Sequence, residues 1–565
     1  MVYLYHILIK TFNILAKPGQ PICELKYLCS MEQKNHPYLP IWFSVVLIGG
    51  ILLGFILGTR TGNFNLLPSG KDKLKEVISY VEDNYVDTLS RKVLEEKAIT
   101  GMLEKLDPHS VYITAEEFHE ANDPLLGSFE GIGVQFRLEN DTVTVINPVS
   151  GGPSEKLGIR AGDRIVKVDG KNIAGIKISN NDVMRKLKGP KGTHVKVSIF
   201  RRGAGGLLDF TITRDVIPTF SMDIAYMAEP GIGYIRLNNF ASTTHDEVHH
   251  ALETLLKDGM KKLILDLRGN GGGYLKAAID VADEFLGKGE LIVYTEGMNH
   301  KREVSKATSD GLFEKGELVV LVDEGTASAA EIVSGAIQDH DRGVIVGRRS
   351  FGKGLVQEQL DFKDGSALRL TVARYYTPTG RCIQKSYKDG LETYNSDYYH
   401  RFMNGEMEHR DSIKFPDSLK YKTPKGRIVY GGGGIMPDIF VPMEKDSALQ
   451  YYNKVINKGL AYQFAFDYTD RNRLQLRHFK NATQFDHGFT VTGAIFGDFV
   501  QYADKKGVKH DGKDLSKSDR FVKTMLKAYI GRNMLDNNGF FPVLNTIDPG
   551  FLKAIEILQK DEAKL

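Results

Sequence analysis

The chain has 565 residues, of which 42% are hydrophobic and 26% are charged. This length accommodates several domains, and the composition is ordinary for folded globular protein. The formal net charge of +3 is small for a chain of this size and argues against a nucleic acid as the main partner. The three cysteines, Cys23, Cys29 and Cys382, are too few for a disulfide framework and too scattered for a zinc site.

An uncharged run at residues 39–58 has about the length of one bilayer span. Lys26 and Lys34 precede it, and positive charge before a span favours a cytoplasmic N-terminus. No Ala-x-Ala-like cleavage site follows, so an uncleaved anchor is favoured over a removed signal peptide, with a buried core helix as the alternative. The run predicts a single-pass protein of the cell (inner) membrane whose later domains face the periplasm or cell exterior. Residues 1–38 are then cytoplasmic, and Met31 is a second candidate start of translation.

Residues 71–124 are predicted to be helical. Apolar residues recur there at the i, i+3, i+4 spacing of a helix face, for example Leu74, Val77 and Ile78. The helical pattern ends at the segment Leu106-Asp-Pro-His-Ser110.

Residues 125–216 are predicted to form a compact β-rich module. A glycine-rich turn leads into a strand at Val134, and apolar and polar residues alternate in later segments such as Thr142-Val-Thr-Val-Ile146. The pattern resembles a PDZ domain, which implies that the turn captures the terminal carboxylate of a peptide and that the strand edge accepts the peptide as an added strand. The expected peptide contacts are Ile132, Gly133 and Val134; a β-rich lid without a groove is the alternative.

Three short apolar runs, at residues 262–267, 317–323 and 343–347, predict buried parallel strands of one sheet. Each run is followed by a segment rich in glycine or polar residues. Because the carboxyl ends of parallel strands meet at one edge, these segments are expected to lie together where α/β proteins usually carry their chemistry.

The second and third segments carry a serine and a lysine. Ser328 opens a predicted helix, and Lys353 stands between two glycines. A hydroxyl is a weak nucleophile until a base removes its proton, and lysine serves as that base only when burial lowers its pKa. The consecutive glycines Gly271–Gly273 after the first strand let backbone N–H groups converge on one point, as an oxyanion hole requires.

Each of these segments also has an ordinary structural interpretation. Ser328 and Glu331 have the spacing of a capping box, most lysines are solvated, and consecutive glycines form turns. The segment around Gly352-Lys353 also resembles a phosphate-binding loop. However, Gly354 stands where such a loop needs Ser or Thr, and the alternation in 355–360 predicts a strand rather than a helix, so the NTPase alternative is disfavoured.

Taken together, the segments resemble the C-terminal processing (tail-specific) peptidases. The signatures of this family are a strand ending DLRxNxGG, a TASASEI-like nucleophile segment, FGKGxVQ and a later RYYTPxGRxIQ. They occur here in the same order, at residues 266–273, 326–332, 351–357 and 374–384. Ala330 replaces a second serine of the common pattern at a position that is not the nucleophile.

The resemblance implies a serine endopeptidase without a metal or other cofactor. Ser328 would be the nucleophile and Lys353 the general base, with Gln357 orienting the lysine. The backbone N–H groups of Gly273 and Ala329 would form the oxyanion hole. The position of Ala329 in the first turn of a helix agrees on physical grounds, since N–H groups are free there and the helix dipole favours negative charge.

Other classes of function fit less well. The chain has 15 histidines, but none lies in the four motifs. His245, His249 and His250 have helical spacing among polar neighbours, which is weak support for a metal site. A catalytically silent PDZ scaffold that binds the tails of envelope proteins is the alternative function.

The sequence therefore predicts a multidomain α/β protein with a crotonase-like peptidase core. Expected partners are proteins with exposed C-termini and the membrane, together with a second copy of the chain or an adaptor protein. The segment 386–425 is a polar, tyrosine-rich arm. The expected domains are a cytoplasmic segment at 1–38, the anchor at 39–58, a helical region at 71–124, the PDZ domain at 125–216, the Ser–Lys core at 217–445 and a mostly helical extension at 446–565.

Overall fold

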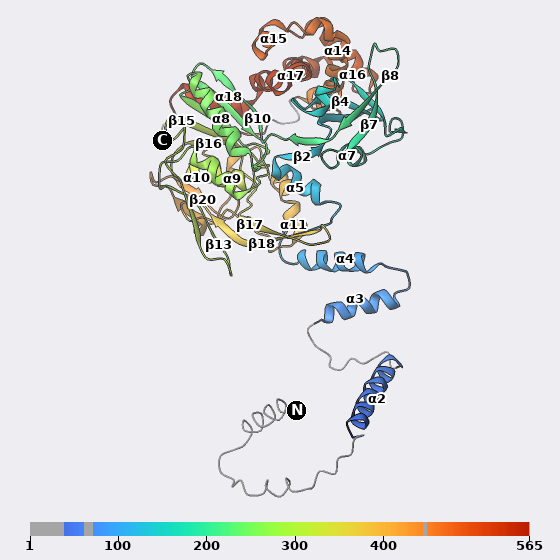
Figure 1. Cartoon of the computed structure of the whole chain (residues 1–565). Helices are drawn as coiled ribbons and strands as arrows, with labels where there is room; N and C mark the ends of the chain where they lie inside the picture. Colours follow the sequence, from blue (N-terminus) through green and yellow to red (C-terminus); the bar gives the residue numbers. More distant parts are fainter. Residues whose placement is uncertain (1–38, 61–71, 444–448, 564–565) are drawn as a thin grey trace. The chain divides into compact units, whose positions relative to one another are not determined.

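The computed structural model describes residues 39–60, 72–443 and 449–563 (Figure 1). It divides into two compact units, Met1–Leu94 and Glu95–Leu565. The predicted cytoplasmic segment at 1–38, with the candidate start Met31, lies outside the described residues.

The first unit contains the helix α2 (Leu39–Arg60), which covers the predicted membrane span. A search of the described residues finds no helix with both the length and the apolar character that crossing a membrane needs. α3 (Lys73–Asn84) and α4 (Arg91–Leu103) follow, as the apolar spacing predicts.

A six-stranded sheet forms the centre of the second unit, in the order β10-β11-β12-β15-β16-β21. β10 and β11 are antiparallel, and the other neighbours are parallel, so the three predicted strands are adjacent and run in one direction. The strands are β10 (Met222–Glu229), β11 (Ile232–Leu237), β12 (Lys262–Asp266), β15 (Glu317–Val322), β16 (Val344–Gly347) and β21 (Ile439–Phe440).

The central strands are apolar throughout because both faces of the sheet are covered. Side chains on one face, such as Leu265 and Val320, pack with the helices α8 (Thr244–Lys257), α9 (Leu275–Asp283) and α10 (Ala329–Asp339). Alternate side chains on the other face pack with the C-terminal helices. These helices are α13 (Gln450–Asn457), α14 (Leu460–Leu476), α15 (Ala482–Gly488), α16 (Gly493–Lys505), α17 (Gly512–Leu544) and α18 (Pro549–Gln559).

A second sheet carries the strand that follows Lys353. β17 (Leu355–Asp361) pairs with β18 (Ala367–Tyr376), so the predicted strand after the lysine is confirmed. β18 also pairs with β1 (Val111–Ile113) and β13 (Leu291–Glu296), and β13 pairs with β14 (Glu303–Lys306). The sheet thereby brings the segment near residue 110 beside the segment that contains Lys353.

The β-rich module is an insertion whose entry and exit strands pair with each other. These are β2 (Ser128–Gly131) and β9 (Asp215–Pro218). Within the module the strand order is β3-β4-β5-β7-β8, which leaves β3 at an edge. Its elements are β3 (Val134–Glu139), β4 (Thr142–Pro148), α6 (Pro153–Lys156), β5 (Arg164–Val168), β6 (Lys171–Asn172), α7 (Asn180–Leu187), β7 (His194–Phe200) and β8 (Leu207–Thr213).

The remaining elements lie around the core. The polar arm contains the two short α-helices α11 (Leu391–Asn395) and α12 (Asp397–Met403) and the strand β19 (Lys420–Lys422). Outside the arm, β20 (Ile428–Tyr430) pairs with β19, and α5 (Phe118–Leu126) precedes the β-rich module. The fold class is as predicted: an α/β core with an inserted β-rich module and helical segments on both sides.

Candidate active site

The three motifs meet at one edge of the central sheet, as predicted. Thr326 Oγ1 donates to the carbonyl of Leu267 at 2.8 Å, and the Ala327 N–H donates to the carbonyl of Asn270 at 2.9 Å. On the other side, the Phe351 N–H donates to the carbonyl of Thr326 at 2.9 Å. The segment that carries Ser328 is therefore held between the glycine turn and the lysine segment.

Ser328 has a backbone conformation that is unusual for a residue with a side chain. Its φ of 54° and ψ of −115° lie outside the favoured regions, at the residue that precedes α10. Such strain persists only where neighbouring contacts hold it, and it is common at active sites. The Glu331 carboxylate accepts the Ser328 N–H at 2.8 Å, so the contact between these two residues that a capping box predicts is present.

The glycine turn approaches Ser328 too closely for side chains. Gly272 has a φ of +94°, and a Cβ atom there would lie 2.7 Å from Ser328 Cβ and 2.9 Å from the backbone nitrogen of Ala329. Gly273 has a φ of +152°, and a Cβ atom there would lie 1.9 Å from the carbonyl oxygen of Phe240. Both positions require glycine on conformational and steric grounds.

The two expected oxyanion donors have no competing partner among the described residues. Phe240 and Gly273 form an isolated parallel bridge in which the Phe240 N–H donates to Gly272 and the Tyr274 N–H donates to Phe240. In this pattern the hydrogen bonds on either side of Gly273 are made by the carbonyl of Gly272 and the N–H of Tyr274. The N–H of Gly273 itself points away from Phe240. Within the described part of the chain, neither Gly273 N–H nor Ala329 N–H makes a hydrogen bond.

Lys353 is half-buried and makes no ion pair within the described residues. Its Nζ donates to Gln357 Oε1 at 3.0 Å, and Gln357 Nε2 in turn donates to the carbonyl of His109. Burial lowers the pKa of Lys353, and the positive charge of Arg369 lowers it further. The Ser328 hydroxyl and Lys353 Nζ are not hydrogen-bonded to each other in this conformation.

Two buried side chains connect the backbone of Ser328 to that of Lys353. One is Glu331, whose Oε2 accepts both N–H groups at 2.8 Å; its Oε1 accepts Ser350 Oγ at 2.5 Å and the Gly352 N–H at 2.7 Å. The other is Tyr375, whose hydroxyl lies 3.0 Å from the Ser328 carbonyl and also contacts the Lys353 carbonyl. Burial raises the pKa of Glu331 to about 7, although the four donors oppose the shift.

The segment Asp107–Ser110 belongs to the site, which the sequence did not reveal. Asp107 accepts hydrogen bonds from Ser110 Oγ at 2.5 Å and from Thr371 Oγ1 at 3.0 Å, and Thr371 is the strand partner of Gln357. The ring of His109 lies 2.8 Å from the Tyr394 hydroxyl. Burial and the nearby charge of Lys353 lower the pKa of His109 to about 4. In the sequence, the only indication of this segment is a Pro-His-Ser run after a predicted helix. The run does not indicate which strand the segment would join.

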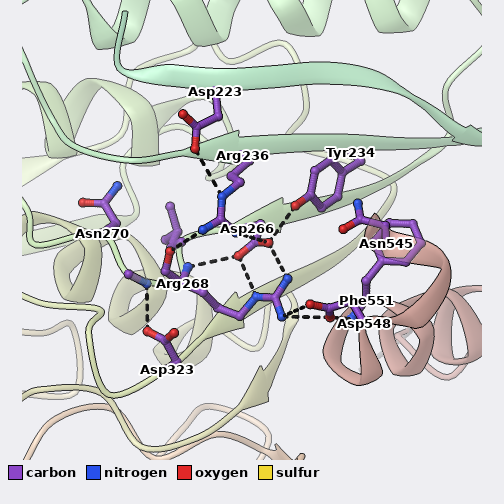
Figure 2. Close-up of polar contacts among 12 residues, drawn as sticks. Asp223, Tyr234, Arg236, Asp266, Arg268, Asn270, Asp323, Asn545, Asp548 and Phe551 are labelled. Atoms are coloured by element: carbon purple, nitrogen blue, oxygen red, sulfur yellow. Dashed lines mark hydrogen bonds and ion pairs between the residues drawn. The ribbon is translucent and has the colours of Figure 1, made fainter. Parts of the chain in front are cut away.

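Asp266 and Arg268 of the first motif serve to fix the end of β12 (Figure 2). Asp266 is fully buried and accepts hydrogen bonds from Tyr234 at 2.7 Å and from Arg236 at 2.8 Å, as well as from Arg268. Although burial opposes ionisation, the charges of Arg268 and Arg236 hold the pKa of Asp266 below its usual range. Arg268 also binds Asp548 at 2.8 Å, which links this edge of the sheet to the C-terminal helices.

The predicted peptide contacts lie on the turn before β3. Ile132 is buried in the apolar cluster that includes Val183 and Leu187 of α7, and Val134 packs against this cluster. Gly133 has a φ of +69°, which favours glycine. Over the described residues, the N–H groups of Ile132 and Gly133 have no hydrogen-bond partner, so both are available to an anion.

Models of known families match most parts of the sequence. Peptidase family S41 matches residues 231–393, a range that includes Ser328 and Lys353. A PDZ domain matches residues 131–212, and the N-terminal domain of the activating protease CtpB matches residues 60–117. A family of unknown function matches residues 451–536.

Characterised relatives are similar over more than half of the chain. The chain is 36% identical over 352 residues to the carboxy-terminal processing protease CtpA of Bacillus subtilis, covering 61% of this chain and 74% of that protein. It is 40% identical over 315 residues to the carboxy-terminal-processing protease of Bartonella bacilliformis, covering 55% and 71%. The solved photosystem II D1 C-terminal processing protease is 29% identical, with a TM-score of 0.35 and coverage of 66% and 87%.

Proposed function

The chain belongs to peptidase family S41, the carboxy-terminal processing proteases, and on this premise we propose that Ser328 and Lys353 form its catalytic dyad. The protein is a serine protease with a PDZ domain. The observation that carries the proposed dyad is the pair of buried side chains, Glu331 and Tyr375, that each bind the backbone of both residues. They hold nucleophile and base at one edge of the sheet, beside two free N–H donors.

In the proposed reaction, Lys353 Nζ accepts the hydroxyl proton as Ser328 Oγ attacks the carbonyl carbon of the peptide bond. The N–H groups of Gly273 and Ala329 bind the oxygen that becomes negative; each such donor typically contributes about 2.7–4 kcal/mol to transition-state stabilisation. Lys353 then gives the proton to the leaving amine. Water, activated by the same lysine, releases the acyl group from Ser328.

A second buried lysine, Lys385, is a poorer candidate for the base. Its Nζ lies 2.9 Å from Asp397 and stacks on the rings of Phe351 and Tyr394. Burial lowers the pKa of Lys385, but the carboxylate of Asp397 opposes this shift by stabilising the charged ammonium. Lys353 instead faces the neutral amide of Gln357, which stabilises the ammonium less than a carboxylate does, and burial and Arg369 lower its pKa.

We propose that the PDZ domain selects substrates by their C-terminal ends. β3 is an edge strand, and the free N–H groups before it suit a terminal carboxylate. Ile132, Gly133 and Val134 are the proposed contacts. A peptide that ends in an amide instead of a carboxylate is then expected to be cleaved more slowly at limiting concentration, through a higher KM.

The dyad is tested with the full chain and an unfolded reporter protein that has a free C-terminus. Ser328→Ala, Lys353→Ala and Lys353→Arg are each expected to lose cleavage by about a thousandfold or more; guanidinium does not release its proton near neutral pH. Ser334→Ala, on the same helix, and Lys385→Met are the controls and should retain cleavage. Full activity of Lys353→Ala, or its loss only in Lys385→Met, would contradict the proposal.

The same variants separate the rival functions. A silent PDZ scaffold would bind tail peptides equally in wild type and Ser328→Ala and would cleave in neither form. An NTPase would show ATP-dependent thermal stabilisation that Lys353→Ala abolishes.

Membrane attachment through residues 39–58 is a separate proposal. The uncharged run supports it, whereas no helix in the described part of the chain has the length and apolar character of a span. Recovery of the full chain in the membrane pellet after alkaline carbonate extraction is the expected result. Recovery in the supernatant would exclude an uncleaved anchor.

A further inference from the structure

Two histidines on α8 share one buried carboxylate, away from the proposed dyad. His245 and His249 are four residues apart, which places them on one face of the helix. The carboxylate is Glu284, which ends α9, the helix beside α8. His250 lies next to this pair in sequence but near Glu253, at 3.8 Å.

The three side chains converge on one point. His245 Nε2 lies 2.9 Å and His249 Nδ1 lies 2.7 Å from the same oxygen, Glu284 Oε1. The ligand atoms of the three residues all lie within 4.8 Å of one another. Nitrogen and oxygen ligands of tetrahedral zinc, at bonds of about 2.0–2.1 Å, are roughly 3.3 Å apart. The two nitrogen–oxygen separations are shorter than this value, so the half-exposed rings would have to move away from Glu284 Oε1 to admit an ion.

The environment of Glu284 also favours a cation. The carboxylate is only 2% exposed, and the two imidazoles are its only ion-pair partners within the described residues. A buried carboxylate needs a compensating positive charge. Because an imidazole carries that charge only when it is protonated, two neutral imidazoles would leave Glu284 without compensation. The other oxygen, Oε2, accepts the N–H of Leu312 at 2.9 Å, which fixes the orientation of the carboxylate as neighbouring groups do for metal ligands.

We propose that His245, His249 and Glu284 bind a divalent transition-metal ion, with zinc as the best match, that joins α8 to α9. Two imidazoles and one carboxylate are typical zinc ligands and leave one position for water. Magnesium and calcium prefer sets made of oxygen atoms alone, so this site discriminates against them.

The position of the site suggests a structural role. α8 follows Phe240 in the chain, and α9 follows Gly273; these two residues form the bridge that orients the proposed oxyanion donor. An ion between the helices stabilises the two segments on which this bridge depends. Because binding occurs only in the folded state, zinc raises the melting temperature.

The test is a titration of the metal-free full chain with Co²⁺, which absorbs visible light strongly when tetrahedral, followed by displacement with Zn²⁺. Wild type is expected to bind one ion per chain. His245→Gln, His249→Gln and Glu284→Gln are expected to weaken binding by at least tenfold. His250→Ala, on the same helix, is the matched control and should bind as wild type does.

Glutamine at position 245 or 249 keeps a hydrogen-bond donor for Glu284 but is a poor metal ligand. The metal-free melting temperatures of these variants should therefore stay close to that of wild type, so lost binding does not reflect lost folding. The proposal is overturned if wild type gives no tetrahedral cobalt spectrum, if the glutamine variants bind as tightly as wild type, or if His250→Ala removes binding.

Discussion

Glu331 has the most consequential set of contacts of any single residue at the proposed site. Its carboxylate is fully buried and accepts four hydrogen bonds, two on each oxygen, from both the serine and the lysine segments. An ionised carboxylate satisfies all four donors, whereas a protonated carboxylate or an amide does not. The residue that looks like a capping group in the sequence therefore positions the proposed nucleophile and base.

Glu331→Gln is expected to lower kcat/KM by about a hundredfold and the free energy of unfolding by about 1–3 kcal/mol, because the amide nitrogen faces two N–H or O–H donors. Peptide cleavage and urea denaturation measure the two effects. Glu324→Gln, in the same segment but paired with Arg348, is the control for activity. An active Glu331→Gln enzyme would show that the two segments keep their positions without this carboxylate.

The raised pKa of Glu331 also predicts how stability depends on pH. The folded state binds the proton of the Glu331 carboxyl group more tightly than the unfolded chain does. The contribution of Glu331 to the free energy of unfolding therefore falls as pH rises from about 4.5 to about 7 and is constant above pH 7. Relative to Glu331→Gln, wild type should therefore lose stability across this range. Urea denaturation of both proteins over the range measures the difference; parallel profiles would contradict the assignment.

Arg369 is predicted to set the pH range in which Lys353 can act as a base. Its charge favours the neutral form of Lys353, so Arg369→Gln should raise the lysine pKa and move the acidic limb of the kcat/KM profile to higher pH, by roughly half a pH unit. Arg374→Gln, on the same strand, is the matched control. A limb that stays in place would mean that Lys353 does not govern it.

At the scale of elements, the end of β12 depends on a helix that is far away in the sequence. Arg268 binds both Asp266 and Asp548, and Asp548 also caps α18 by accepting the Phe551 N–H at 2.7 Å (Figure 2). α18 packs against β15 and β16. The proposed oxyanion turn, which follows Arg268 directly, is thus supported by the C-terminal helices.

Asp548→Asn separates the two roles of this side chain, since asparagine is also a good N-cap but does not neutralise Arg268. The expected loss in unfolding free energy is about 1–3 kcal/mol, together with reduced kcat/KM, because a buried guanidinium loses one of its two carboxylates. Asp548→Ala should lose about 1 kcal/mol more. Urea denaturation distinguishes the variants; an unchanged Asp548→Asn protein would show that Asp266 suffices for Arg268.

At the scale of the whole molecule, the PDZ domain contacts the helical extension as well as the core. The Arg137 guanidinium lies 4.2 Å from the centre of the Tyr462 ring, and Arg202 lies 3.4 Å from Asp470. Asn147 donates to Asp536, which has a strained φ of 54° inside α17. These contacts join the domain to the helices α14 and α17 of the extension.

Tyr462→Leu is expected to increase hydrogen exchange in β3 and β4 several-fold, since it removes the ring beneath Arg137, and to leave the exchange of β15 unchanged. Tyr468→Leu, on the same helix but stacked on Phe464 and near Phe489, is the control. Equal exchange in wild type and Tyr462→Leu would mean that other contacts hold the domain.

The sequence predicted the parts of the site that are local in the chain. Strand runs followed by glycine or polar segments indicated that Gly273, Ser328 and Lys353 would meet at one edge, because parallel strands end together. It did not predict that His109 would support Gln357 or that Asp548 would bind Arg268. Those contacts depend on which distant strand or helix lies alongside, and nothing in the local pattern of either segment determines that choice.

The late position of Asp548 has a consequence for protein synthesis. A ribosome completes the serine and lysine segments long before it reaches α18, so a nascent chain lacks the anion that steadies the end of β12. Newly made protease is therefore expected to reach full activity only after translation has passed this helix. Chains that stop early would be poor enzymes even though every proposed catalytic group is present.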